Sequence, residues 1–472
     1  MADSVTMDKI VSLCKRRGFI FPGSEIYGGL ANTWDYGPYG VELANNIKRL
    51  WWKYFIQNRE DMVGLDAGIF MNSRVWEASG HISSFSDPLM DCKSCKERVR
   101  GDKLIEQWAE THGNKYPKHF AGEKTDPFDL LEFIMDEKIV CPSCHELNWT
   151  KPRRFNLMFE THQGVTEGDK SLIYLRPETA QGIFVNFKNI VQSNRKRIPF
   201  GIGQVGKAFR NEITPGNFIF RTREFEQMEI EYFVHENEWK SLYDDWRKTM
   251  ENFYLDVLCF KKEKMRWRQH EQKELSHYSK ETWDVEYEFP FGWGELWGIA
   301  YRTDFDLKQH SANSGELLDY LDPDTGLRFM PHCIEPTFGL NRTLLTALVD
   351  AYAEDLAPSE KEGTDEERRI VLKFHPSLAP VKVSILPLMK KLKDGAYGLY
   401  QDVKKHFVAE FDDSGSIGKR YRRQDEIGTP FCVTFDFQSL DDKAVTVRHR
   451  DSMQQERVKI DNLILYLSER LL

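Results

Sequence analysis

The sequence lacks a long apolar segment. No stretch of its 472 residues approaches the roughly 18 uninterrupted apolar residues of a membrane span, and residues 1–18 contain no apolar core of a secretory signal. The last residues, Leu471 and Leu472, form no lipidation motif. These absences predict a cytoplasmic protein with no membrane partner.

Cysteine is also scarce. Of the eight cysteines, four form two CxxC pairs and four are scattered, namely Cys14, Cys259, Cys333 and Cys432. This usage fits a reducing compartment better than a disulfide framework. The pairs Cys92/Cys95 and Cys141/Cys144 offer the four thiolates of a closed, structural zinc site, with unmetallated buried thiols as the alternative.

Internal repeats and long low-complexity segments are absent, and the length allows two or three domains. The net charge of −9 is unevenly distributed: residues 371–472 carry 17 Lys and Arg against 14 Asp and Glu, which leaves −12 on the remainder. A mildly basic C-terminal segment on an acidic body indicates an anionic partner for that segment.

Changes in composition predict the domain boundaries. The cysteine pairs bracket an insertion at about 92–150, and a polar, tryptophan-rich stretch predicts a second insertion at about 236–290. Residues 358–370 are charged and nearly devoid of apolar side chains, as in a linker. We therefore expect one large domain over 1–357 and a small domain over 371–472.

The C-terminal segment alternates apolar strand-like and helix-like runs. This alternation predicts a small α/β domain of about 100 residues. We expect strands at 371–374, 381–387, 431–437 and 444–449, with helices at 399–411 and 460–471.

Apolar residues recur at helical spacing from Val41 to Phe55, after the turn residues 36–40. This pattern predicts a helix that faces the core. Its adjacent residues Trp51 and Trp52 cannot both face one side, so one of them is available to cover another subunit.

The segment 209–231 alternates like two strands joined by the turn-forming residues 214–217, which predicts an antiparallel hairpin. Arg210 and Glu212 would share a face of the first strand. Phe225, Gln227, Glu229 and Glu231 would share a face of the second. Such a face suits a charged ligand with a flat ring, whereas a solvated hairpin is the alternative.

Residues 335–342 predict a strand, a glycine turn and a helix that opens near Arg342. The N-terminus of a helix with an arginine in its first turn is a natural anion site.

These two segments resemble motifs 2 and 3 of the class II aminoacyl-tRNA synthetases, and the helix over 41–55 resembles motif 1, which forms the dimer interface. Segments 35–38, 75–81, 174–182 and 295–307 are similar to the dimeric type of glycyl-tRNA synthetase, so the resemblance covers nearly the whole chain. It implies an α+β catalytic domain, with an antiparallel sheet and flanking helices, and a C-terminal α/β anticodon-binding domain. It also implies a homodimer that activates glycine with ATP to glycyl-adenylate and transfers glycine to the 3′ end of tRNA(Gly).

The resemblance implies an ATP site in which Arg210 and Arg342 are catalytic. Arg210 would grip the α-phosphate, Phe225 and Arg342 would stack on the two faces of adenine, and Glu295 would hold Mg²⁺. Glu212 would bind the adenine amino group and Arg221 would reach the γ-phosphate. The implied ATP-binding set is Arg210, Asn211, Glu212, Phe220, Arg221, Thr222, Arg223, Glu224, Phe225, Glu295, Leu296, Gly339, Leu340, Asn341 and Arg342.

A site for glycine gains no affinity from a side-chain pocket, so it must hold the ammonium and carboxylate and exclude a methyl group. The glutamates supply more negative charge than one ammonium needs, and Arg100 and Arg302 are candidate counter-charges. The implied set is Arg100, Glu178, Phe225, Glu226, Gln227, Met228, Glu229, Glu231, Arg302, Glu335, Pro336, Thr337, Phe338 and Gly339.

In the C-terminal domain, a cluster of basic side chains with one aromatic ring lies where the family contacts RNA. Arginine and tyrosine suit stacking on unpaired anticodon bases. The cluster consists of Lys419, Arg420, Tyr421, Arg422 and Arg423.

Two other functions are alternatives. A catalytically inactive relative, such as the accessory subunit of a mitochondrial DNA polymerase, would bind nucleic acid without ligation. Such a protein is expected to lose the motif arginines, yet Arg210, Arg221 and Arg342 are present. A class II synthetase for another amino acid would need a roomier pocket and different residues at Glu229, Glu231 and Thr337.

Overall fold

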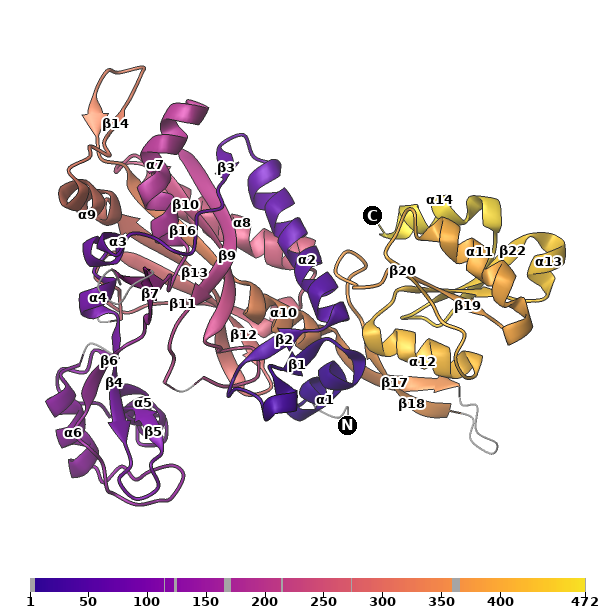
Figure 1. Ribbon diagram of the computed structural model, residues 1–472, viewed down its shortest axis with the longest axis horizontal. Coiled ribbons are helices and arrows are strands. Elements are labelled where there is room, and N and C mark those ends of the chain that lie inside the picture. Colours follow the sequence, from indigo (N-terminus) through magenta and orange to yellow (C-terminus); the bar gives the residue numbers. More distant parts are fainter. Residues whose placement is uncertain are drawn as a thin grey trace.

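A seven-stranded sheet forms the centre of the computed structural model, which describes residues 5–113, 115–122, 125–164, 171–213, 215–272, 274–358 and 366–471. The strand order is β11-β12-β13-β16-β10-β9-β3, and every pairing is antiparallel except that of the edge strand β3 with β9 (Figure 1). The antiparallel sheet of the predicted catalytic domain is therefore confirmed. The strands are β3 (Met62–Gly64), β9 (Phe200–Phe209), β10 (Glu224–Val234), β11 (Met265–Gln269), β12 (Glu281–Phe289), β13 (Gly292–Thr303) and β16 (His332–Gly339).

Helices cover both faces of this sheet. On one face, α2 (Pro38–Trp52), α8 (Trp239–Asn252) and α10 (Leu340–Ala351) pack on the main apolar core, which includes Met228 and Ile230 of β10. On the other face, α7 (Ala180–Asn194) and α9 (Phe305–Ser314) form a smaller core with Phe233. Since side chains alternate along β10, Glu229 and Glu231 lie on the same face as Phe233, beneath α7.

The helix predicted over 41–55 is α2, which continues into the π-helical turn η2 (Lys53–Gln57). Trp51 is fully buried in the main core. Trp52 is partly buried and lies against Gly64, where an added Cβ would come within 2.5 Å of the indole. The proposed role of one of these tryptophans in covering a partner stays a prediction.

The segment predicted as a second insertion, 236–290, is instead part of the central architecture. It supplies α8, a second π-helical turn η4 (Phe253–Val257) and the sheet strands β11 and β12. Its tryptophans suggested an appended element, but Trp267 of β11 and Trp283 of β12 cover Arg247 of α8. Its polar composition reflects an edge of the sheet that faces solvent on one side.

The cysteine-bracketed insertion forms a separate lobe, which lies below the body of the molecule in Figure 1. It has a three-stranded sheet in the order β5-β4-β6 and a core of its own. Its elements are β4 (Ser86–Asp91), β5 (Arg98–Arg100), α5 (Gly101–Thr111), α6 (Pro127–Asp136) and β6 (Arg153–Asn156).

The C-terminal domain is a five-stranded mixed sheet in the order β20-β19-β21-β22-β23, flanked by helices, so the predicted α/β domain is confirmed (Figure 1). The helix predicted at 399–411 lies earlier in the chain: it ends at Val403, and a short strand follows it. A helix over Ile417–Ile427 and the last strand were not predicted. The elements are β19 (Val383–Pro387), α11 (Lys393–Val403), β20 (Ala409–Phe411), α12 (Ile417–Ile427), β21 (Phe431–Phe435), α13 (Gln438–Asp442), β22 (Ala444–His449), β23 (Gln455–Lys459) and α14 (Ile460–Leu471).

A two-stranded hairpin of β17 (Tyr352–Pro358) and β18 (Glu366–Leu372) joins the two domains. The predicted strand at 371–374 therefore begins earlier and pairs outside the C-terminal sheet. Of the predicted linker, residues 359–365 lie outside the described residues, and the rest belongs to this hairpin.

The remaining elements are short, apart from the first helix, and no helix among the described residues combines the length and apolar character needed to cross a membrane. These elements are α1 (Met7–Arg17), β1 (Ile20–Pro22), η1 (Glu25–Tyr27), β2 (Trp34–Tyr36), α3 (Arg74–Ala78), α4 (His81–Ser84), β7 (Phe159–Gln163), β8 (Ser171–Leu175), η5 (Lys262–Lys264), β14 (Tyr320–Leu321), β15 (Arg328–Phe329) and η6 (Lys390–Leu392).

A buried arginine connects the hairpin to the C-terminal domain. Arg369 of β18 binds Asp355 of β17 through Nη2 at 3.0 Å and Asp425 of α12 through Nη1 at 3.0 Å. It also donates to the carbonyl of Arg450 at 2.9 Å. Because the guanidinium is fully buried, loss of it would leave buried carboxylates without their full complement of positive partners.

We predict that Arg369→Ala lowers the free energy of unfolding by about 3 to 5 kcal/mol, as expected when one partner of a buried ion pair is removed. The adjacent Arg368 is exposed and pairs with Glu354, so Arg368→Ala should cost less than about 1 kcal/mol. Urea unfolding of both variants measures the difference. Equal losses would contradict the role assigned to Arg369.

Candidate active site

A pocket lies where β10, β13 and β16 meet the start of α10. The strand β9 ends at Phe209, so Arg210 and Glu212 lie just beyond it and not on a strand face as predicted. The backbone N–H of Arg210 donates to the carbonyl of Arg223 at 2.9 Å, which closes the base of the intervening loop. Within that predicted turn, Thr214 lies outside the described residues. The pocket is lined by Arg210, Glu212, Phe220, Arg221, Thr222, Phe225, Glu226, Gln227, Glu295, Leu296, Trp297, Thr337, Gly339, Asn341 and Arg342.

Three guanidinium groups line this pocket, which we call the arginine pocket. Arg342 lies 3.1 Å from the carboxylate of Glu295 and donates to the carbonyl of Glu295 at 2.9 Å. Arg221 lies 3.6 Å from Glu212, and Arg210 donates to the carbonyl of Pro177 at 3.0 Å. Arg342, and after it Arg221 and Arg210, hold the pKa of Glu295 below its usual value against the effect of burial. The three guanidinium groups, which lie among three lining glutamates, offer charge-assisted donors that suit a polyanion.

Aromatic rings and backbone contacts fix the arginines. The guanidinium of Arg342 lies 4.6 Å from the centre of the Phe220 ring, and that of Arg210 lies 5.3 Å from the Phe225 ring. Asn341 accepts from the backbone N–H of Glu226 at 3.1 Å, which ties the first turn of α10 to β10. The pocket therefore combines flat apolar surfaces with cations, as a nucleotide requires.

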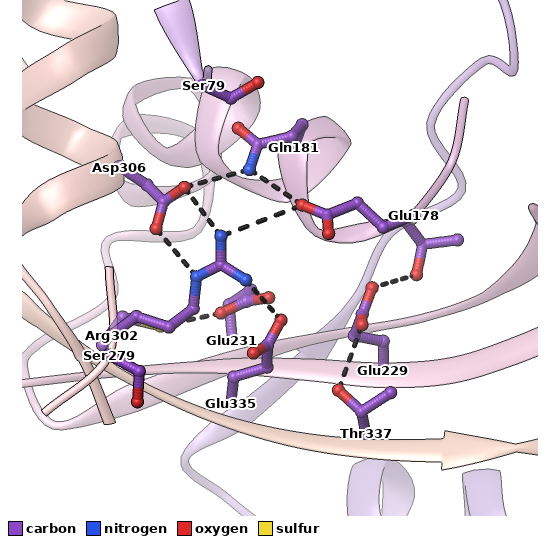
Figure 2. Close-up of polar contacts among 12 residues, drawn as sticks. Ser79, Glu178, Gln181, Glu229, Glu231, Ser279, Arg302, Asp306, Glu335 and Thr337 are labelled. Atoms are coloured by element: carbon purple, nitrogen blue, oxygen red, sulfur yellow. Dashed lines mark hydrogen bonds and ion pairs between the residues drawn. The ribbon is translucent and has the colours of Figure 1, made fainter. Parts of the chain in front are cut away.

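Next to this pocket, on the α7 face of the sheet, five acidic side chains surround one arginine. We call this group, Glu178, Glu229, Glu231, Asp306 and Glu335, the carboxylate cluster. Arg302 binds Asp306 through two hydrogen bonds of 2.8 Å each and donates to Glu335 at 2.7 Å (Figure 2). Its guanidinium also lies 3.8 Å from Glu178 and 3.9 Å from the centre of the Tyr278 ring. A single, fully buried cation thus balances part of the cluster.

Glu178 has three polar partners, Gln181, His81 and Arg302. Gln181 donates to Glu178 at 2.9 Å and to Asp306 at 2.9 Å (Figure 2). His81 lies 3.4 Å from Glu178. Burial by itself would raise the pKa of Glu178, but His81, Arg302 and Gln181 outweigh it and lower that pKa. Glu178 is therefore a fixed negative charge.

The other glutamates carry less fixed charge. Glu229 accepts hydrogen bonds from Thr179, from Gln227 at 3.2 Å and from Thr337 at 3.1 Å, yet burial and the charge of Glu178 raise its pKa. Burial also raises the pKa of Glu335, to about 8. The cluster can therefore take up an additional positive charge, since a bound cation would restore the ionised form of these groups.

Glu231 lies deepest. It accepts from the thiol of Cys333 at 2.8 Å, and its other oxygen has no hydrogen-bond partner among the described residues. Burial and then Glu335 raise its pKa well above the usual value, which favours the neutral form of Glu231.

Comparison with known proteins identifies the family. Residues 159–352 match the model "tRNA synthetase class II core domain (G, H, P, S and T)", and residues 382–470 match "Anticodon binding domain". The chain is 58% identical over 474 residues to a glycine–tRNA ligase of Caldanaerobacter subterraneus subsp. tengcongensis, with 100% of both chains covered. It is 57% identical to those of Alkaliphilus oremlandii and Clostridium acetobutylicum, again with 100% of both chains covered. The chain belongs to the glycine–tRNA ligase family.

A solved prolyl-tRNA synthetase from Cryptosporidium parvum, complexed with L-proline and AMP, shares the fold. Its TM-score is 0.61 at 14% sequence identity, and the match covers 99% of this chain and 76% of that chain. This likeness supports the class II architecture alone.

Most of the predicted ATP-binding residues line the arginine pocket, and four do not. Arg223 and Glu224 line a neighbouring hollow with Lys207. Leu340 is buried in the main core, and Asn211 donates its backbone N–H to Leu157.

The predicted glycine-binding residues divide by sheet face. Glu178, Glu229, Glu231, Arg302 and Glu335 come together in and around the carboxylate cluster (Figure 2). Met228 and Phe338 pair across β10 and β16 and point into the core on the opposite face. Glu226 faces Lys48 at 3.2 Å, and Pro336 is buried.

The structure does not bring Arg100 to this site. Arg100 is buried in the insertion lobe, where it lies 2.9 Å from Asp87 and 2.7 Å from Asp102. Arg302 provides the counter-charge within the carboxylate cluster. The sequence did not reveal that Arg100 belongs to a separate lobe.

Several residues of the site were missed in the sequence. Thr179 and Gln181 lie within the segment 174–182, and Asp306 lies four residues after Arg302 at the start of α9. A motif match could have drawn attention to them, but their contacts depend on α7 and α9 packing against the same strand ends.

The two CxxC pairs come together in the insertion lobe. The sulfur of Cys92 lies 3.6 Å from that of Cys144, and the sulfur of Cys95 lies 3.6 Å from that of Cys141. All four sulfurs lie within 4.8 Å of one another, an arrangement that fits a four-thiolate metal site.

The raised pKa of Glu335 predicts a pH dependence of stability. Its pKa is about 8 in the folded protein against an ordinary value of 4.5, so between these values the folded state holds a proton that the unfolded state has lost. The free energy of unfolding should therefore fall as pH rises from 5 to 8. This decrease with pH should vanish in Glu335→Gln. It should persist in Glu288→Gln, which changes an exposed residue of β12.

Urea unfolding at pH 5, 6, 7 and 8 compares the three proteins. Parallel pH profiles for the original protein and Glu335→Gln would show that Glu335 is ionised throughout.

Proposed function

We propose that this protein ligates glycine to tRNA through a glycyl-adenylate. The observation that carries the proposal is the position of the carboxylate cluster beside the arginine pocket, with Thr337 lining the join. A triphosphate suits the arginines, and a small ammonium suits the carboxylates. Glycine's carboxylate would attack the α-phosphorus, the bond to the β-phosphate bridging oxygen would break, and pyrophosphate would leave with its electron pair.

Specific residues support each part of this reaction. Arg210 would hold the α-phosphate, Arg221 the γ-phosphate, and Phe225 and Arg342 the two faces of adenine. Glu212 would accept from the adenine amino group. Positioning and charge neutralisation supply the catalysis, without a dedicated protein base.

Glu229 and Glu178 would bind the ammonium of glycine, with Thr337 donating to Glu229. The hydroxyl of Thr337 is held at 3.1 Å from Glu229, so its methyl group occupies space that a side chain on the substrate would need. This arrangement favours glycine over a larger amino acid.

Class II synthetases use ATP with Mg²⁺, and Glu295 is the residue that we propose for the ion. Its side chain is half exposed at the mouth of the arginine pocket and is held ionised. Magnesium prefers carboxylate and phosphate oxygens, and there it would neutralise phosphate charge.

The C-terminal domain would bind the anticodon of tRNA(Gly), but the predicted cluster is largely committed to the fold. Arg420 is buried and donates to three backbone carbonyls, Tyr421 contacts Thr434, and Arg423 binds Asp412. Lys419 is exposed and stays a candidate contact.

A second set of residues supports RNA binding better. Met389 and Phe437 are exposed just beyond the carboxyl ends of β19 and β21, and the amino group of Lys391 lies 4.4 Å from the Phe437 ring centre. In an open α/β sheet this edge is the usual ligand site. Exposed rings beside lysines suit unpaired bases.

A homodimer in the cytoplasm is also proposed, by the resemblance of α2 to motif 1. The loop between β1 and β2 supports a subunit contact, because Ile26 and Tyr27 are 89% and 86% exposed there. Large exposed apolar side chains close together are typical of interfaces.

The decisive test is pyrophosphate exchange into ATP with each amino acid in turn. We expect glycine to support exchange at least roughly a hundredfold better than alanine or serine, because the pocket has no room for a side chain. Faster exchange with another amino acid would refute the specificity, and none with any amino acid would favour an inactive relative.

Removal of a pocket arginine should abolish activation without unfolding the protein. Arg210→Ala and Arg342→Ala should each reduce the exchange rate by about a hundredfold or more, the effect of losing one group that stabilises developing charge. Arg328→Ala, which removes an exposed arginine paired with Asp319, serves as the control and should leave exchange intact. Normal exchange in folded Arg210→Ala would exclude its assigned role.

One structural zinc ion per chain is proposed at Cys92, Cys95, Cys141 and Cys144. Metal analysis of protein purified without chelator should find about one equivalent, and Cys141→Ser should lose the metal and increase proteolysis within the insertion lobe. Cys259→Ser, at an exposed cysteine of the body, should keep both properties. Less than half an equivalent in the original protein would contradict the site.

A further inference from the structure

A second pocket opens beside the arginine pocket, and several of its lining residues have no role in the proposed activation. It lies over β12 and β13, and we call it the His270 pocket. Glu295 and Thr337 line both pockets, and Glu335 of the carboxylate cluster also lines the second one. A ligand in the His270 pocket therefore lies against the place where the glycine and phosphate sites meet.

The floor of this pocket is open and polar. Asp284 of β12 pairs with Gly298 of β13, and a Cβ at Gly298 would lie only 3.4 Å from the Asp284 carboxylate. The glycine thus leaves the carboxylate uncovered on that side. Ser276, Tyr278 and Thr282 add hydroxyl groups to the wall.

Two residues in this pocket form a tight pair. His270 Nε2 lies 2.6 Å from Asp284 Oδ2, and the backbone N–H of His270 donates to the carbonyl of Thr282 at 3.0 Å. The Asp284 side chain is buried, and burial followed by the charge of Glu295 raises its pKa to about 6. The hydrogen bond to Asp284 raises the pKa of His270. The pair is a fixed group with both donor and acceptor atoms inside a cavity.

The second half of the proposed reaction needs a ligand at this place. A ribose hydroxyl at the tRNA 3′ end must attack the carbonyl carbon of the adenylate, whose bond to the phosphate oxygen breaks. AMP then leaves with the electron pair and takes up the proton that the hydroxyl loses. The hydroxyl must be held beside the join of the two substrate sites, since orientation of the reactants controls such a step.

We propose that the His270 pocket receives the 3′-terminal nucleoside of the tRNA and that His270 and Asp284 position it for attack on the adenylate. The inference rests on the proposed function. It assigns the pair to the transfer step and not to activation, because neither residue lines the arginine pocket and their side chains bond to each other.

The test separates the two steps in Asp284→Asn and His270→Ala. Pyrophosphate exchange without tRNA should stay within about twofold of the original rate. Single-turnover transfer from preformed glycyl-adenylate should slow by roughly tenfold or more, as expected when a charge-assisted contact is lost. Glu281→Gln removes a carboxylate on the same strand that contacts Lys240 outside the pocket, and it should change neither step.

Binding of two tRNAs distinguishes direct contact from a structural role. Removal of the 3′-terminal nucleotide should weaken binding to the original protein, and this difference should shrink in Asp284→Asn because the contact is already lost. The assignment would be overturned by variants in which exchange and transfer slow together, or in which the transfer rate is unchanged. Equally weakened binding of both tRNAs would also overturn it. An original protein without glycine-dependent exchange would overturn the proposed function itself.

Discussion

The site depends on the burial of one guanidinium among carboxylates. Arg302 is fully buried and holds Asp306 and Glu335 at hydrogen-bond distance, with Glu178 slightly farther away. Without this cation, several acids could not share so small a volume, since each would be protonated or would repel its neighbours. With it, Glu178 stays ionised, while burial keeps the pKa values of Glu229 and Glu335 above the usual value. The cluster is thereby prepared for one more small cation.

The antiparallel register places this cluster beside the arginine pocket. Glu229 pairs with Thr337 and Gln227 pairs with Gly339, so two residues along β10 separate the ammonium side of the site from the start of α10. Alternation along the strands then sends Met228 and Phe338 into the opposite core. This pair of strands therefore packs on the core with one face and presents the residues of the site on the other. The stability of the core and the precision of the site come from the same register.

Much of this could be predicted from the sequence, and the failures have physical causes. Period-two alternation identified the face of β10 that carries Gln227, Glu229 and Glu231, because strand geometry alone sets that face. The alternation did not reveal that Arg210 lies beyond the end of β9, since strand ends depend on pairing partners. Arg100 and Arg302 are chemically equivalent in the sequence, and only the tertiary fold separates the lobe of one from the site of the other.

The predictions for the C-terminal domain and for the segment 236–290 failed in part for the same reason. Lys419 to Arg423 looked like an exposed basic cluster, yet helix α12 turns Arg420 inward to bind carbonyl groups. A polar edge of a large sheet and an inserted segment have similar compositions, so β11 and β12 could not be assigned to the sheet from composition. Long-range packing decides both cases.

The central claim is that Glu229 in the carboxylate cluster recognises the ammonium of glycine. It is tested most directly by the affinities of two stable adenylate analogues, glycyl-sulfamoyl-adenosine and the same molecule without its amino group, for the original protein and for Glu229→Gln. The account predicts that the amino group strengthens binding to the original protein by roughly a hundredfold and that most of this gain is lost in Glu229→Gln, with the deamino analogue bound almost equally by both. Equal weakening of both analogues by Glu229→Gln would contradict it.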